Sequence, residues 1–273
     1  MPQTVANGVR IHYVEEGTGS ETVVLSHSYL VDHRHFEAQI DALAEDYRVL
    51  AYDHRDHGRS QRMSGSYGME EIYQDGVSFL ETVGAPPCHW IGLSAGGFVG
   101  LRIAIRRPEL LRSLVVLDSA ADLEPPLQRL KYRLMLLAVG TVGFRPVVGQ
   151  GMKAMFGRDF LRAPARQNER ELWRKRIQAN GRKATVRFGK AIFGRDSVEE
   201  ELDRIEAPTL VAVGDQDRAV SPERARRTAE GIPEARFETI SDCGHLSTVE
   251  QPQRTTRLLS SFLEAPDSAG TPD

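Results

Sequence analysis

Short apolar runs alternate with longer stretches of mixed polarity along the first 120 residues of the chain, and the alternation returns after residue 208. Runs that are apolar at nearly every position are typical of strands buried on both faces of a sheet. Between them, apolar residues recur every three or four positions, which predicts amphipathic helices. The predicted strands are residues 9–14, 22–26, 48–52, 88–91, 113–117, 209–213 and 235–240, and the predicted helices are residues 35–45, 70–83, 95–106, 222–230 and 251–263.

This order of elements predicts an α/β protein with a mostly parallel central sheet and helices on both faces. The pattern breaks between residues 122 and 203, which contain helical patterns at 127–139, 145–156, 165–179 and 182–192 but no strand pattern. The charge changes as well, since residues 122–204 carry +8 and the rest of the chain −11. We therefore predict a core formed by residues 1–121 and 204–273, with residues 122–203 inserted as a helical cap over the active edge of the sheet.

The apolar side chains of the predicted cap have two interpretations. They either line a pocket or pack the cap onto the core, and we favour packing. The Arg excess of the cap either attracts a carboxylate-bearing substrate or forms a solvated basic surface, and we favour the surface. The apolar side chains that line a pocket or pack the cap are Leu127, Leu130, Leu134 and Leu137 at helical spacing, together with Phe144, Met152, Met155, Phe156, Trp173, Phe188 and Phe193.

The most informative motif is Gly92-Leu93-Ser94-Ala95-Gly96, a G-x-S-x-G sequence between a predicted strand and a predicted helix. A serine at a sharp strand-to-helix turn has a strained backbone, and glycines on both sides avoid steric clashes. The turn exposes the hydroxyl beside the unpaired N–H groups of a helix N-terminus. This context predicts that Ser94 is a nucleophile.

A serine nucleophile needs a base, and the base needs a group that orients it. Among the eight histidines, His245 is the best candidate because it follows a strand pattern that ends at residue 240. Asp217, in the loop after the strand at 209–213, is the predicted acid. Asp118, after the strand at 113–117, is the alternative.

Other histidines and the composition restrict the remaining possibilities. His33 and His35 have the spacing of half a metal site, but no cluster completes it in the sequence, so we expect histidines on a helix surface and no metal or cofactor. A net charge of −3 gives no reason to expect nucleic acid. No apolar stretch approaches the roughly 20 residues that cross a bilayer, and the N-terminus has no signal pattern, so we expect no membrane association.

Cysteine usage and the chain's end give two further expectations. Cys88 and Cys243 are too few for a disulfide framework, and we expect both to be reduced and buried in a cytoplasmic protein. The polar residues 265–273 are expected to form a loose end. The sequence gives no indication of oligomeric state.

Four segments in order resemble signatures of α/β-hydrolase-fold enzymes, including the esterase and enol-lactonase-like branch. The order of serine, acid and histidine also matches that family. The resemblance covers nearly the whole chain apart from the cap. The segments are the apolar strand and His-containing loop of residues 25–29, the D-x-R-x-H-G-x-S loop of residues 53–60, the G-x-x-D acid loop of residues 214–217, and the histidine loop with its following helix, Gly244-His245 with Glu250 and Pro252.

The resemblance implies an oxyanion hole formed by the backbone N–H groups of Tyr29 and Ala95. Two residues depart from the family pattern. Ser28 stands where a glycine is usual, and its hydroxyl is a candidate contact to substrate. Asp56 also replaces a glycine and is expected to alter the pocket mouth or to pair with Arg55 or Arg59.

We therefore predict a serine hydrolase that cleaves a small-molecule carboxylic ester or lactone through an acyl-Ser94 intermediate. Ser28, Leu134, Phe144 and Trp173 are the candidate substrate-binding residues. Carbon–carbon bond hydrolysis, amide hydrolysis and a cofactor-free perhydrolase or haloperoxidase activity remain open within the same fold. The alternative outside enzymes is a ligand receptor that retains Ser94, Asp217 and His245 but turns its ligand over slowly or not at all.

Overall fold

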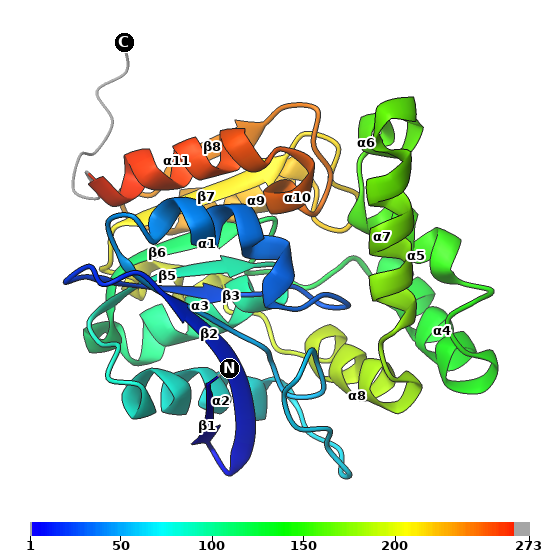
Figure 1. Ribbon diagram of the computed structural model, residues 1–273, viewed down its shortest axis with the longest axis horizontal. Helices are drawn as coiled ribbons and strands as arrows, with labels where there is room; N and C mark the ends of the chain where they lie inside the picture. The colour runs from blue at the N-terminus through cyan, green and yellow to red at the C-terminus, as the bar shows by residue number, and fades with distance from the viewer. Residues whose placement is uncertain (1, 265–273) are drawn as a thin grey trace.

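The computed structural model describes residues 2–264, and its centre is a single eight-stranded sheet (Figure 1). β1 pairs antiparallel with β2, and β2 pairs antiparallel with β4, whereas all other neighbouring strands are parallel. The predicted mostly parallel sheet is therefore confirmed. In spatial order the strands are β1 (Gln3–Ala6), β2 (Val9–Glu16), β4 (Arg48–Tyr52), β3 (Thr22–Ser26), β5 (Cys88–Leu93), β6 (Leu111–Leu117), β7 (Thr209–Gly214) and β8 (Arg236–Ile240).

The central strands match the predicted ranges closely because every residue of β3, β5 and β7 is buried, which produces continuous apolar runs. β1 was not predicted. It is a four-residue edge strand, and of its residues only Ala6 is buried, so its sequence has no such run.

Helices cover both faces of this sheet, as predicted. Figure 1 shows α1 and α11 side by side on one face and α2 and α3 on the other. α9 packs against β7 and β8. The helices of this part are α1 (Glu37–Leu43), α2 (Met69–Thr82), α3 (Ala95–Arg106), α9 (Pro222–Gly231), α10 (Ser247–Glu250) and α11 (Pro252–Glu264), with the short 3₁₀ turns η1 (His33–Phe36), η2 (Pro108–Leu110) and η4 (Glu199–Arg204).

The chain between β6 and β7 forms helices that lie together at one side of the sheet, at the right of Figure 1. α4 packs along α8, and α5 packs against α7. Among the α-helices between β6 and β7, only α6 lacks a counterpart among the predicted helices. The elements are α4 (Pro126–Val142), α5 (Val148–Met155), α6 (Arg158–Arg162), η3 (Pro164–Arg166), α7 (Gln167–Gln178) and α8 (Arg182–Phe193).

Polar contacts that are buried or partly buried connect these helices to segments at the carboxyl edge of the sheet. Arg187 on α8 donates to both oxygens of Asp56, at 2.8 and 2.9 Å. The Gly157 N–H, between α5 and α6, donates to Glu250 at 2.8 Å. Asn180, before α8, donates to the Leu30 carbonyl at 2.8 Å. Contacts at three separate points hold this helical segment against the core.

Asp56 therefore pairs with a residue that the sequence analysis did not consider. Its backbone φ of 65° lies in the left-handed region, which explains why a glycine is common at this position. Arg55 binds Asp75 instead, at 2.5 and 2.6 Å. The Asp56 carboxylate offsets its unfavourable backbone by accepting hydrogen bonds from Arg187 and from the Tyr67 hydroxyl.

The leucines of α4 do not follow the favoured interpretation, which was packing on the core. Leu127, Leu130, Leu134 and Leu137 are more than half exposed, so they do not pack on the core, although Leu134 lines an open groove beside α4. α4 instead buries Leu136 and Val139, on the side that packs against α8. Because α4 carries apolar residues on more than one side, its periodicity does not determine which side faces inward.

Both cysteines are buried and unpaired, as expected. Among residues 2–264, none of the helices has the length and apolar character needed to span a bilayer. The expected loose end at residues 265–273 lies outside the described residues.

Candidate active site

Ser94 occupies a strained turn between β5 and α3. Its backbone φ of 53° and ψ of −106° lie outside the regions that residues other than glycine normally adopt. Its N–H donates to the Leu117 carbonyl on β6 at 2.9 Å. A Cβ at Gly92 would lie 2.2 Å from the Gly96 carbonyl oxygen, and one at Gly96 would lie 2.0 Å from that of Ser26. The two glycines of the motif are therefore required by close backbone contacts.

His245 and Asp217 meet as the sequence analysis anticipated. His245 Nδ1 lies 2.8 Å from Asp217 Oδ2, and both side chains are buried. The other oxygen of Asp217, Oδ1, accepts hydrogen bonds from the N–H groups of Ala219 at 2.8 Å and Val220 at 3.0 Å. These bonds fix the carboxylate so that Nδ1–H donates to it, which leaves Nε2 of His245 as the free acceptor of the ring.

The surroundings of His245 favour its protonated form. Burial alone would lower the pKa of the imidazole, but the charge of Asp217 and its hydrogen bond outweigh burial. The pKa of His245 therefore lies above the ordinary value of 6.5. A base of this kind is neutral, and able to accept a proton, only at pH values above that raised pKa.

Asp118, the alternative acid, has a different set of partners. Its Oδ1 accepts the Gly214 N–H at 2.9 Å and its Oδ2 accepts the Ser247 N–H at 3.3 Å, and the described residues contain no hydrogen bond between it and His245. Burial and the nearby charge of Asp217 raise the pKa of Asp118 to about 7. Its carboxyl group thus ties β7 and the histidine loop to the end of β6.

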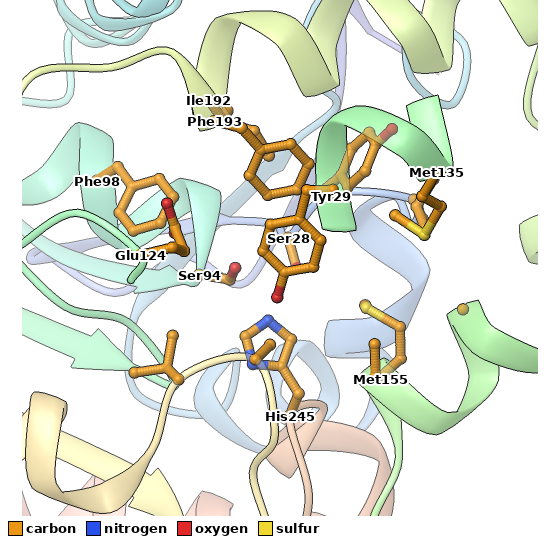
Figure 2. Close-up of a pocket in the computed structure, with 16 residues that line it drawn as sticks. Ser28, Tyr29, Ser94, Phe98, Glu124, Met135, Met155, Ile192, Phe193 and His245 are labelled. Atoms are coloured by element: carbon orange, nitrogen blue, oxygen red, sulfur yellow. The ribbon is translucent and has the colours of Figure 1, made fainter. Parts of the chain in front are cut away.

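Ser94 and His245 line the same cavity, of about 50 Å³, at the carboxyl edge of the sheet (Figure 2). Most of the wall is apolar, which favours uncharged groups. The residues around it are Ser28, Tyr29, Leu30, Ser94, Phe98, Glu124, Tyr132, Met135, Gly151, Ala154, Met155, Ile192, Phe193, Ala219, Val220 and His245.

Tyr29 connects this cavity to the helical segment. Its hydroxyl donates to the Thr185 carbonyl on α8 at 2.8 Å, and its ring stacks on Phe188 with a 6.0 Å centroid distance. The described residues contain no hydrogen bond from the backbone N–H of Tyr29 or Ala95 to another part of the chain. Neither N–H group therefore has an acceptor within the part of the chain that the structure describes.

Ser28 lies in the wall of the cavity and is fully buried, and its Oγ has no hydrogen-bond partner among the described residues. Its φ is not positive, so the Cβ that replaces the usual glycine hydrogen causes no backbone strain. Of the candidate substrate-binding residues, Ser28 is the one that the structure places at the cavity.

Three candidate substrate-binding residues lie elsewhere. Leu134 is 57% exposed and lines an outer groove that adjoins this cavity, and Phe144 packs against the core. Trp173 is buried near Phe156, 6.5 Å between ring centroids. Their apolar character reflects surface and packing positions. The sequence analysis did not single out Phe98, Glu124, Tyr132 or Met135, since no motif marks them.

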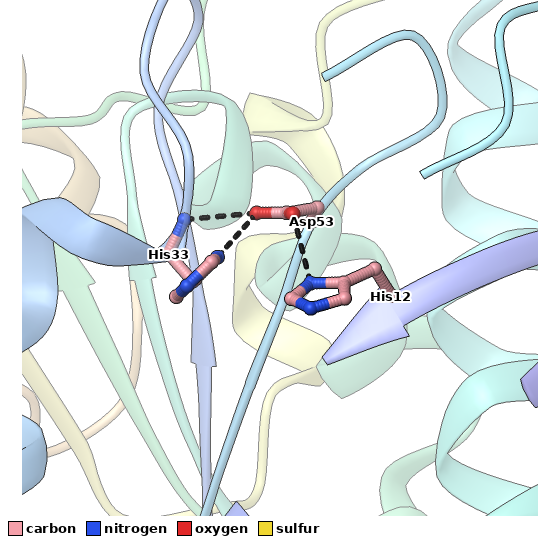
Figure 3. A group of neighbouring side chains, drawn as sticks. All are labelled: His12, His33 and Asp53. Carbon is pink, nitrogen blue, oxygen red and sulfur yellow. Dashed lines mark hydrogen bonds and ion pairs between the residues drawn. The ribbon is translucent and has the colours of Figure 1, made fainter. Parts of the chain in front are cut away.

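The histidines outside the site correct another expectation. His33 is not on an open helix surface, since its N–H and Nδ1 both contact Asp53 Oδ1, at 3.0 and 2.8 Å (Figure 3). His12 Nδ1 and the Arg59 N–H contact Oδ2, at 3.0 and 2.9 Å. His35 is buried against Thr248. A carboxylate offers about four acceptor sites, all used here, so this His12–His33–Asp53 cluster anchors the loop after β4.

The histidine loop also packs closely against the turn between α5 and α6. A Cβ at Gly244 would lie 2.2 Å from the Gly157 nitrogen and 2.6 Å from the Phe156 carbonyl carbon. Gly244→Ala is therefore expected to displace this loop, to cost about 1–3 kcal/mol of stability, and to lower kcat/KM at least tenfold. Thermal unfolding and ester kinetics measure the two effects.

Gly149→Ala is the matched control for that substitution. Gly149 lies on α5, and a Cβ there meets nothing within 4 Å. Alanine favours a helix over glycine, so this variant is expected to be at least as stable as the parent protein. Equal stability and activity of the two variants would show that the tight contact at Gly244 is not needed.

Comparisons with known proteins agree with this geometry. A family model described as alpha/beta hydrolase fold matches residues 21–252. A putative carbamate hydrolase RutD of Stutzerimonas stutzeri is 29% identical over 226 residues, covering 82% of this chain and 84% of that protein. The 3-oxoadipate enol-lactonase 1 of Acinetobacter baylyi is 26% identical over 245 residues, covering 89% and 88%.

Solved structures give the same result. A thermophilic esterase from Thermogutta terrifontis superposes with a TM-score of 0.89 at 25% identity, covering 98% of this chain and 99% of that chain. An enol-lactonase from Burkholderia xenovorans superposes with a TM-score of 0.89 at 26% identity, covering 96% and 100%.

Proposed function

The chain belongs to the α/β-hydrolase fold family and is a hydrolase, and from that premise we propose that it cleaves a carboxylic ester or lactone through an acyl-Ser94 intermediate. The observation that carries the proposal is the Asp217–His245 pair, joined at 2.8 Å, with His245 lining the same cavity as Ser94 (Figure 2). An activated serine beside an apolar cavity suits acyl transfer from an uncharged substrate.

The reaction follows from the partners of each group. His245 Nε2 takes the proton from Ser94 Oγ while Oγ attacks the carbonyl carbon. The Tyr29 and Ala95 N–H groups bind the oxygen that becomes negative. The imidazolium then protonates the leaving alkoxide, which gives the acyl-serine. A water molecule, deprotonated by His245, releases the acid and restores Ser94.

In this proposal residues 122–203 form a cap that completes the site. Met135, Met155 and Phe193 come from α4, α5 and α8 and supply one side of the cavity wall (Figure 2). The Tyr29–Thr185 bond couples the cap to the loop that carries one oxyanion donor. The cap is therefore expected to exclude water and to hold the donor in position.

A fluorophosphonate probe and a substrate panel test the proposed function. The probe should add to Ser94 in the folded protein, as seen by intact and peptide mass spectrometry, and an ester substrate should slow the addition. Hydrolysis of p-nitrophenyl esters, lactones and carbamates identifies the preferred acyl group. A folded protein that reacts with no probe and hydrolyses none of the panel would contradict the proposed function and favour a ligand receptor or scaffold.

The raised pKa of His245 predicts the acidic side of the pH profile. Only the neutral imidazole accepts the Ser94 proton, so kcat/KM should fall tenfold per pH unit below a midpoint above 6.5. Steady-state kinetics with a neutral p-nitrophenyl ester between pH 5 and 9 measures this profile. A rate that stays constant down to pH 5.5 would contradict the role of His245 as the base.

A further inference from the structure

The inner cavity contains one carboxylate that the proposed reaction does not use. Glu124, in the loop before α4, lines the cavity and is 5% exposed. Figure 2 shows it beside Phe98 and near Ser94. The rest of the cavity wall is mainly apolar. A substrate that fills the cavity therefore has to place a suitable polar group next to this carboxylate.

Glu124 retains unused capacity to accept hydrogen bonds. Both of its oxygens contact a single nitrogen, Arg195 Nη1, at 3.0 and 3.1 Å, and the described residues give it no other donor. A carboxylate has about four acceptor sites, so positions remain for a donor in the cavity.

Arg195 lies behind the carboxylate and does not line the cavity. Its other N–H groups donate to the carbonyls of Ile192 and Asp122, both at 2.8 Å, and its guanidinium covers the Phe98 ring at 3.7 Å. Among the residues that line the cavity, none is Lys or Arg. Of the Glu124–Arg195 pair, the group that lines the cavity is therefore the negative one.

Three other cations lie further out. A groove of about 610 Å³ shares Tyr132, Met135 and Ala154 with the inner cavity, and Lys131, Lys153 and Arg218 line it. These charges attract anions to the mouth, but they do not line the inner site. The charge of the cap as a whole therefore does not describe the charge next to Ser94.

Resting on the proposed function, we propose that Glu124 makes this site selective for acyl substrates that present an N–H or O–H donor, and that it disfavours substrates with a carboxylate at that position. A donor such as a carboxamide satisfies the free lone pairs of Glu124. A carboxylate there faces a like charge without a cation in contact, which costs binding energy.

Three small esters with the same rigid trans skeleton test the proposal: ethyl crotonate, ethyl fumaramate and monoethyl fumarate, ending in a methyl, a carboxamide and a carboxylate. The trans double bond prevents the terminal group from attacking its own ester. For the parent protein, kcat/KM for the fumaramate ester should exceed that for the fumarate ester at least tenfold, measured by proton release at pH 8.

Glu124→Gln removes the charge and keeps an oxygen for Arg195. Its amide also donates to a carboxylate, so the fumaramate-to-fumarate ratio should fall at least tenfold. Because the ratio is compared between variants, the intrinsic reactivity of each ester cancels. Glu109→Gln is the control, since Glu109 is exposed and binds Arg107, and it should keep the parent ratio.

The outcomes separate this proposal from the proposed function. A parent protein that hydrolyses ethyl crotonate but shows no preference for the fumaramate ester would overturn the role of Glu124, while serine hydrolysis would stand. A ratio unchanged in folded Glu124→Gln would overturn it as well. No turnover of any ester together with no fluorophosphonate addition at Ser94 would instead contradict the proposed function.

Discussion

Ser94→Ala is expected to lower kcat for ester hydrolysis by at least about 10⁴-fold, because removal of the nucleophile of a triad leaves only the contribution of binding and the oxyanion donors. The folded structure should be retained. The backbone N–H of residue 94 still donates to Leu117, and alanine keeps the Cβ that the strained φ of 53° already accommodates. Kinetics, thermal unfolding and probe addition measure the result.

Ser113→Ala is the matched control for Ser94→Ala. Ser113 is a buried serine on β6, outside the cavity, and its hydroxyl contacts His89 Nδ1 at 2.8 Å. Its removal should cost about 1 kcal/mol of stability and leave kcat close to that of the parent. Loss of activity in both variants, or in neither, would contradict the assignment of the nucleophile.

The fold could be predicted because its central strands are buried on both faces. β3 and β4 match the predicted ranges, since all but one of their residues are buried and the interior of each strand is an apolar run. The helical segment between β6 and β7 was predicted less well. The exposed Leu127 and the buried Leu136 share α4, and the side that α8 covers depends on tertiary packing.

The site residues also differ in how far the sequence around them predicts their contacts. Ser94, Asp217 and His245 follow strand ends, so their meeting at one edge follows from the parallel sheet. Glu124 has no comparable signal. Its partner Arg195 lies 71 residues away, and neither belongs to a recognisable motif. The partner of Asp56 could not be predicted either, because Arg187 lies 131 residues away in the sequence.

The second large effect should separate the two candidate acids. Asp217→Asn is expected to lower kcat by about 10³–10⁴-fold, as expected for an acid that fixes the tautomer of the base. The N–H groups of Ala219 and Val220 would hold the amide oxygen where Oδ1 now lies, and the amide nitrogen would then face His245 Nδ1. The imidazole would carry its proton on Nε2 and have no acceptor for Ser94.

Asp118→Asn is expected to lower kcat less than tenfold, because Asp118 does not contact His245 and its pKa of about 7 already makes it partly protonated near neutrality. Its charge does help to raise the pKa of His245, so its removal should move the acidic limb of the pH profile to lower pH. Asp217→Asn should instead lower the rate at every pH. If Asp118→Asn caused the larger loss in folded protein, the acid would be Asp118, and the 2.8 Å contact between Asp217 and His245 would serve only the structure of the loop.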